Sequence, residues 1–143
     1  MAFPAPEPVL VIGYAYLWHH EHLGGREEGR KDRPSAIVFA SKQAFDGATM
    51  VTVLPITHSP PDNPDWAVEI PAAVKRNLGL DDQRSWIVVG EGNRFLWPGY
   101  DLRPVGHTDR IDYGFLPPRL LRQVQDAFAK LGLAGKGLMT ERC

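Results

Sequence analysis

Residues 25–38 read Gly25-Arg26-Glu27-Glu28-Gly29-Arg30-Lys31-Asp32-Arg33-Pro34-Ser35-Ala36-Ile37-Val38, and residues 51–57 read Val51-Thr52-Val53-Leu54-Pro55-Ile56-Thr57. The first stretch is a charged, glycine-hinged loop that leads into an apolar strand. The second stretch is an apolar strand that stops at Pro-x-Thr. A strand that is apolar on both sides is typically buried on both faces. The two stretches therefore predict a buried β scaffold with polar, reactive groups at its mouth.

The size and composition of the chain indicate one soluble domain. Its 143 residues are enough to bury a core without metal or disulfide support. With 16 basic and 17 acidic residues the net charge is −1, so any site for a polyanion must be a local patch. The single cysteine, Cys143, favours a reducing compartment. The apolar run at residues 9–18 is too short to span a bilayer and no targeting segment is visible, so we expect a cytoplasmic protein.

The remaining segments predict short strands and two helices. We expect strands over residues 9–18, 36–40, 50–54, 67–70, 85–89 and 95–97, with turns at Asp46-Gly47 and over residues 90–94 and a proline-rich loop over 57–65. A short helix is expected over 72–78, after Pro71 and before Gly79. A longer helix over 118–131, with Gly132 as its cap, is indicated by the helical spacing of Leu120, Val124, Phe128 and Leu131.

These elements predict a fold class and a domain organisation. Five or six short strands, one turn of helix and one terminal helix are typical of a mainly β protein, here a small closed or half-closed barrel. The barrel and the terminal helix would form one domain over residues 1–134. Residues 135–143 are predicted to be a flexible tail.

Three side chains near the two quoted strands are candidates for chemistry. Arg33 stands where the charged loop meets a strand and could bind a phosphate with two parallel hydrogen bonds, or it could pair with a nearby acid. Thr57 at a strand end could donate a hydrogen bond to a phosphoryl oxygen, or it could bond its own backbone in a turn. His58 could move a proton near neutral pH, or it could be an ordinary exposed loop histidine.

Two acidic segments offer further candidates. Glu27 or Glu28 could accept a proton from a ribose 2′-hydroxyl, although either could equally be a solvated partner of Arg30 or Lys31. Glu91 and Arg94 place an acid and a base three residues apart after the most hydrophobic strand.

Histidine side chains could bind a metal ion, and tryptophan side chains could stack on bases. The histidines at 19, 20 and 22 do not match the helical His-Glu-x-x-His spacing, so no metal site is predicted. Tryptophans can stack on bases. Trp86 is expected in the core, whereas Trp66 and Trp97, each next to a proline, are better candidates for an exposed face.

The quoted motifs resemble those of the MazF/PemK toxin family. Four landmarks come in the family's order: the opening strand, Gly-x-Glu-x-x-x-x-x-Arg-Pro followed by Ser-Ala-Ile-Val, the strand Val-Thr-Val-Leu-Pro-Ile-Thr, and Glu91-Gly92-Asn93-Arg94 after the strand at 85–89. The resemblance covers about residues 12–105 and implies an SH3-like barrel of the MazF/PemK/CcdB-like kind. It implies Arg33 and Thr57 as principal catalytic residues, with Glu27 or Glu28 as the contributing loop acid.

The resemblance also implies a function. The expected activity is that of a growth-inhibiting endoribonuclease of a toxin–antitoxin pair, which needs no metal or other cofactor and cleaves single-stranded RNA by attack of the 2′-hydroxyl on phosphorus. The catalytic set would be Arg33, Thr57, Glu28 or Glu27, and His58. Substrate binding would fall to Arg30, Lys31, Glu91, Arg94 and Trp66. The expected partners are a second copy of the chain and a cognate antitoxin, with no membrane.

Two alternatives belong to other classes of protein. The chain could be a catalytically inactive SH3-like module that docks a protein or RNA partner, which the near-zero net charge and the Glu91 segment favour. A metal hydrolase built on His19, His20 and His22 is a weaker option.

Overall fold

The computed structural model describes residues 3–20, 32–43, 46–133, 135 and 137–142. Residues 1–2, 21–31, 44–45, 134, 136 and 143 lie outside this description. In chain order the elements are β1 (Leu10–Tyr14), β2 (Arg33–Lys42), β3 (Thr49–Thr57), the 3-10 helix η1 (Pro64–Trp66), β4 (Ala67–Glu69), α2 (Ala72–Leu78), β5 (Trp86–Val88), β6 (Glu91–Leu96), β7 (Asp112–Phe115), α3 (Pro118–Leu133) and β8 (Leu138–Glu141).

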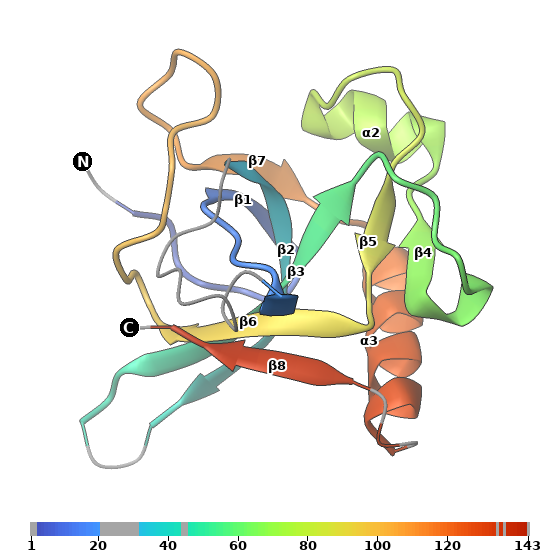
Figure 1. The fold of residues 1–143 in the computed structure, drawn as a ribbon. Helices are drawn as coiled ribbons and strands as arrows, with labels where there is room; N and C mark the ends of the chain where they lie inside the picture. The colour runs from blue at the N-terminus through green and yellow to red at the C-terminus, as the bar shows by residue number, and fades with distance from the viewer. Residues whose placement is uncertain (1–2, 21–31, 44–45, 134, 136, 143) are drawn as a thin grey trace.

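The eight strands form one sheet, which confirms the expected mainly β fold (Figure 1). The strand order is β4-β5-β3-β2-β1-β7, and β6 pairs with both β3 and β8. The strand pairs are antiparallel except for β6 and β8, which run parallel. Among the described residues, the terminal strands β4 and β7 do not pair with each other, so the sheet is not closed.

The central strands are buried on both faces, as their composition predicts. Alternate residues of a strand point to opposite sides of the sheet. Ala36 and Val38 accordingly enter one core cluster, whereas Ile37 between them enters the other. The first cluster lies under α3, whose Val124 is fully buried. The second cluster is aromatic and includes Tyr14, stacked on Phe95 with ring centroids 5.0 Å apart.

Helix α3 packs against β4 and β2. Its buried residues are Leu120, Val124 and Leu131, which confirms the helical spacing read from the sequence. A polar contact adds to this packing, because Gln125 Nε2 donates a hydrogen bond of 2.7 Å to the Val38 carbonyl of β2.

The pairing of β2 with β3 brings two candidate residues to one end of the sheet. Ser35 of β2 faces Pro55 of β3 in an antiparallel register. Arg33 lies two residues before Ser35 and Thr57 lies two residues after Pro55, so both fall at the same end of this strand pair. Near its other end β3 pairs with β6, and at Ile56 and Thr57 it pairs with β5 instead. Thr57 therefore lies where the sheet changes partner.

The short elements around Pro71 follow the prediction closely. Helix α2 spans Ala72–Leu78, Pro71 precedes it, and Gly79 ends it in the left-handed conformation with φ 69°. The segment predicted as a proline-rich loop contains a single turn of 3-10 helix, Pro64–Trp66. The Asn63 side chain caps this turn by accepting a hydrogen bond of 3.0 Å from the Asp65 amide.

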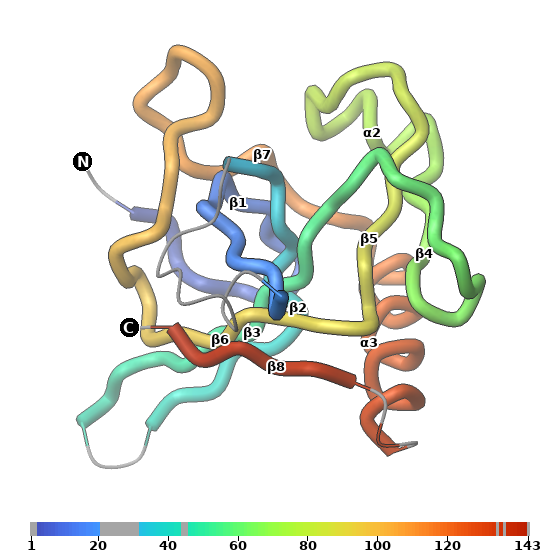
Figure 2. Tube along the Cα trace, viewed as in Figure 1, coloured from blue at the N-terminus to red at the C-terminus, as the bar shows by residue number. Residues whose placement is uncertain are grey.

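The structure corrects three predictions in the second half of the chain and adds one strand. Residues 91–94, expected to be a turn, belong to β6, and Gly92 packs there so closely that an added Cβ would lie 3.0 Å from Leu54 Cδ2. Strand β7 was not predicted. Helix α3 runs past Gly132, which is therefore not its cap. Within the expected flexible tail, Leu138–Glu141 form β8 beside β6 (Figure 2).

Within the described ranges of the chain, no helix combines the length and the apolar character needed to cross a membrane.

Candidate functional site

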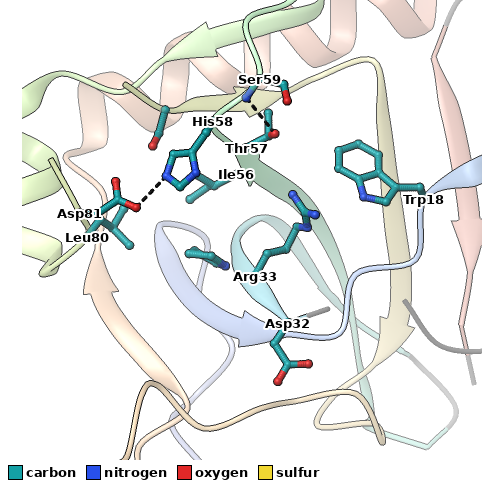
Figure 3. A pocket seen from close by; sticks show the side chains of 11 residues that line it. Trp18, Asp32, Arg33, Ile56, Thr57, His58, Ser59, Leu80 and Asp81 are labelled. Carbon is teal, nitrogen blue, oxygen red and sulfur yellow. Dashed lines mark hydrogen bonds and ion pairs between the residues drawn. The ribbon is translucent and has the colours of Figure 1, made fainter. Parts of the chain in front are cut away.

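A cleft of about 430 Å³ opens at the shared end of β2 and β3. Its lining combines polar side chains with the apolar side chains of Trp18, Ile56 and Leu80 (Figure 3). The lining residues are Trp18, Asp32, Arg33, Pro34, Ile56, Thr57, His58, Ser59, Leu80, Asp81 and Ser85. Three of the sequence-predicted catalytic residues, Arg33, Thr57 and His58, thus line one cleft.

Arg33 begins β2 and is half-buried. Its guanidinium carbon lies over the Trp18 ring, 5.0 Å from the ring centroid, and its Nε atom is buried. A planar guanidinium that stacks on an aromatic ring keeps its charge while the ring restricts its orientation. In Figure 3 the Arg33 side chain extends into the cleft between Trp18 and Thr57. A cation in this place can bind an anionic group that enters the cleft.

Thr57 ends β3, and its hydroxyl is fixed by a turn. The Thr57 Oγ1 atom accepts a hydrogen bond of 3.2 Å from the Ser59 amide. This is the turn geometry that the sequence offered as the ordinary fate of such a threonine. A hydroxyl has one donor proton and two acceptor lone pairs. Because the amide occupies a lone pair, the proton of Thr57 remains able to donate to an oxygen atom in the cleft.

His58 forms an ion pair with an aspartate that the sequence analysis did not single out. The Nε2 atom of His58 lies 2.7 Å from Oδ2 of Asp81, and both side chains are about half exposed, at 51% and 46%. The other oxygen, Oδ1, accepts hydrogen bonds from Lys75 Nζ at 2.9 Å and from the Gln83 amide at 3.1 Å. Chiefly because of the Lys75 hydrogen bond, the pKa of Asp81 lies below its usual value. Asp81 is therefore an anion at neutral pH and faces His58.

Several predicted residues cannot be placed. Glu27, Glu28, Arg30 and Lys31 lie outside the described residues, as does His22. The predictions that Glu27 or Glu28 acts as the base and that Arg30 and Lys31 bind substrate therefore remain predictions.

Glu91 and Arg94 do not line the cleft. The half-buried Glu91 carboxylate accepts hydrogen bonds from the Tyr16 hydroxyl at 3.4 Å and from the His19 amide at 3.2 Å. Burial raises the pKa of Glu91 above its usual value. Arg94 forms an exposed ion pair with Glu141 of β8. Both residues thus connect parts of the fold in this structure, and their predicted role in substrate binding has no support from their position.

Trp66 lies beside the cleft rather than in it. It is 42% exposed and lines a neighbouring, mostly apolar hollow of about 310 Å³. Ser59 lines both hollows, so they adjoin at this residue. The other tryptophans also follow the prediction in part: Trp86 is buried in the core, but Trp97 packs half-buried against the aromatic cluster.

The part of the chain that the structure describes contains no group of three His, Cys, Asp or Glu residues that could hold a metal ion. His19 and His20 are within this part, and His19 uses its backbone amide to bind Glu91.

Sequence reasoning missed Trp18, Asp81 and Lys75 as parts of the site. Trp18 was expected at the end of the strand over residues 9–18, but β1 ends at Tyr14, and Trp18 packs beyond it against the aromatic cluster, where Arg33 stacks on its ring. Lys75 is the clearer omission, because a lysine on the apolar side of a short helix is rarely buried without a partner. Its position three residues before Leu78, on the buried side of α2, was the available signal.

Comparison with known proteins adds no family assignment. No protein-family model matches the chain, and no curated protein matches it either.

Proposed function

We propose that this chain is a metal-independent endoribonuclease of the MazF/PemK kind, which cleaves single-stranded RNA by attack of the 2′-hydroxyl on the adjacent phosphorus. The observation that carries the proposal is the shared cleft. Arg33 and Thr57, the two residues that the motif resemblance selects, come from different strands and line the same opening as His58.

In the proposed reaction the 2′-oxygen attacks phosphorus while the bond from phosphorus to the 5′-oxygen breaks. The products are a 2′,3′-cyclic phosphate and a free 5′-hydroxyl. Negative charge develops on the non-bridging oxygens, where Arg33 can neutralise it and Thr57 can donate a hydrogen bond. The predicted base is Glu27 or Glu28, and His58 is the proposed acid for the leaving 5′-oxygen. Dependence on the 2′-hydroxyl excludes DNA as a substrate.

The broader features of the proposal come from the same resemblance. The mainly β sheet would be an SH3-like barrel of the MazF/PemK/CcdB-like kind. The protein would act in the cytoplasm as a homodimer that inhibits growth until an antitoxin covers the cleft.

Two cleft variants test the activity. Arg33→Ala and Thr57→Ala should each reduce cleavage of a single-stranded RNA in EDTA, by about a hundredfold or more for Arg33→Ala, because each removes a donor aimed at the developing charge. Arg119→Ala, an exposed arginine of α3 outside the cleft, is the matched control and should cleave at the wild-type rate. Circular dichroism checks that all three proteins fold. Full activity of both cleft variants would reject the assignment.

A binding module is the second candidate, and the position of Glu91 favours it. The Glu91 segment carries one of the four landmarks of the resemblance, yet the structure engages Glu91 with Tyr16 and His19 rather than in the cleft. A wild-type protein that binds single-stranded RNA but leaves it intact in EDTA would support this candidate.

A further inference from the structure

A series of polar contacts leads from His58 in the cleft lining through Asp81 to Lys75. The side chains of His58 and Asp81 are both about half exposed. Lys75, which contacts Asp81, has a side chain only 5% exposed. Lys75 Nζ also donates a hydrogen bond to the Gln83 carbonyl. A buried ammonium needs such partners, because an unpaired charge away from water is costly.

The geometry fixes the direction in which Asp81 faces. Lys75 and the Gln83 amide both donate to Oδ1, so Oδ2 is the oxygen that remains for His58. The backbone helps, because Gly79 ends α2 in the left-handed conformation and turns the chain so that Asp81 comes back toward Lys75. Figure 3 shows the His58 ring between Asp81 and Thr57. Since Nε2 faces Asp81, Nδ1 is the nitrogen that can exchange a proton with a molecule in the cleft.

We infer that Asp81, anchored by buried Lys75, is a positioning residue that holds His58 as the general acid of RNA cleavage. This inference rests on the proposed function. In the step concerned, protonated His58 transfers the proton on Nδ1 to the departing 5′-oxygen as the bond from phosphorus to that oxygen breaks. The neutral imidazole then regains a proton from water. The Asp81 carboxylate, 2.7 Å from Nε2, restricts the rotation of the ring and leaves Nδ1 toward the cleft.

The charges near His58 are consistent with this role. Asp81 faces the ring from the segment after α2, and Asp32 and Arg33 line the same cleft from the start of β2. Arg33, which begins β2, is the residue proposed to bind the phosphate, and His58 follows the end of β3, so the cation and the acid come from different segments and can act on different oxygens.

A substrate with sulfur in place of the leaving 5′-oxygen provides the test. A thiol ionises far more readily than an alcohol, so a sulfur leaving group needs no acid. The site of cleavage is first mapped with the wild-type protein, and RNAs with oxygen or sulfur at that bond are then compared in EDTA.

On the oxygen substrate, His58→Gln should lower the single-turnover rate about a hundredfold and Asp81→Asn about tenfold. On the sulfur substrate both should cleave within about twofold of wild type, because the missing acid is no longer needed. Arg33→Ala should remain slow on both substrates. Lys75→Met, which leaves Asp81 anchored by the Gln83 amide, should lose part of the rate on the oxygen substrate and none on the sulfur substrate.

Asp82→Asn is the matched control for Asp81→Asn, since it removes the same charge one residue away and outside the cleft lining. It should cleave both substrates at the wild-type rate. The inference would be overturned if Asp81→Asn cleaved the oxygen substrate at the wild-type rate, or if it cleaved both substrates equally slowly. Either result would leave the proposed function intact. A wild-type protein that cleaves neither RNA would instead reject the proposed function itself.

Discussion

At the scale of single residues, two partly buried ionisable groups show how differently the fold can use a charge. Arg33 lies at the edge of an open cleft, where its guanidinium stacks on Trp18. Glu91 has its carboxylate drawn into the structure, where it accepts hydrogen bonds from Tyr16 and His19 and where burial raises its pKa. Burial therefore disfavours the charged form of Glu91, whereas Arg33 presents its charge to the cleft.

The Glu91→Gln variant should be more stable than wild type at pH 7. Because the pKa of Glu91 is raised in the folded state, the folded protein binds more protons than the unfolded chain between the usual pKa of 4.5 and the folded value. Stability from this group is thus present at low pH and falls as pH rises through that window. Denaturant unfolding at pH 4 and pH 7 should show a gain at pH 7 that disappears at pH 4.

Glu69→Gln is the opposite control. The pKa of Glu69 in the wild-type protein is lowered, first by the hydrogen bond from Arg84. The contribution of Glu69 to stability is therefore present above its usual pKa and is lost as pH falls. This variant should gain nothing at pH 7. A gain of the same size for both variants would show that burial of Glu91 is not the cause.

Residue by residue, the sequence predicted the members of the site that carry a local motif and missed those that depend on long-range contacts. Arg33 before a proline and Thr57 after Pro-x were recognisable because the strand pattern fixes their places. Asp81 was not, because its role depends on Lys75 and on His58, which reaches it from another part of the chain. Nothing in the spacing of these three residues shows that they meet.

At the scale of secondary-structure elements, β8 is the clearest departure from expectation. The strand is short and glycines stand just before it, so the sequence resembles a flexible tail. Strand β8 nevertheless pairs in parallel with β6. The reason lies just after it. Arg142, only 3% exposed, pairs with Asp101 at 2.9 Å and donates hydrogen bonds to the Asn93 side chain and the Ala15 carbonyl. A long-range ion pair of this kind leaves no trace in local sequence pattern.

Removal of this buried arginine should destabilise the protein strongly. Arg142→Met removes the ion pair with Asp101 and the hydrogen bond to Asn93. We expect the free energy of unfolding to fall by about 3–5 kcal/mol. Urea unfolding followed by circular dichroism measures the loss.

The matched control changes the other arginine at the junction of β6 and β8. Arg94 pairs with Glu141, but both side chains are largely exposed, at 46% and 58%. Arg94→Met should cost about 0–1 kcal/mol. Equal losses for Arg94→Met and Arg142→Met would contradict the view that Arg142 anchors β8.

At the scale of the whole molecule, the small net charge limits how the proposed nuclease would bind RNA. With a net charge of −1, long-range attraction is weak, and acidic Asp32 and Asp81 also line the cleft. Binding should depend on a few cations, namely Arg33 with Arg30 and Lys31 from the preceding segment.

The salt dependence of RNA binding should therefore be shallow. Neutralisation of three phosphates on a single strand corresponds to a slope of about −2 in log K against log salt concentration. Fluorescence anisotropy with a labelled RNA that carries 2′-O-methyl groups, and so cannot be cleaved, gives this slope. Arg122→Ala on α3 should leave it unchanged, and a slope of about −5 or steeper would indicate an extended basic surface instead.

The overall architecture was predictable to the extent that it follows from local pattern. The apolar runs of β1 to β3, the stop at Gly79 and the helical spacing of α3 all predicted elements that the structure confirms. The arrangement of β6 between β3 and β8, the unpredicted β7 and the lack of pairing between β4 and β7 depend on contacts between distant segments.

The change of partner along β3 also has a practical consequence for protein engineering. Because β3 pairs with β2, β5 and β6, its backbone is held up to Thr57 by neighbouring strands. Residues 58–63 join β3 to η1 without belonging to a strand or a helix. Grafted loops of other lengths and compositions can therefore be screened at this connection, starting after His58, to retarget what the protein recognises while the framework beneath stays the same.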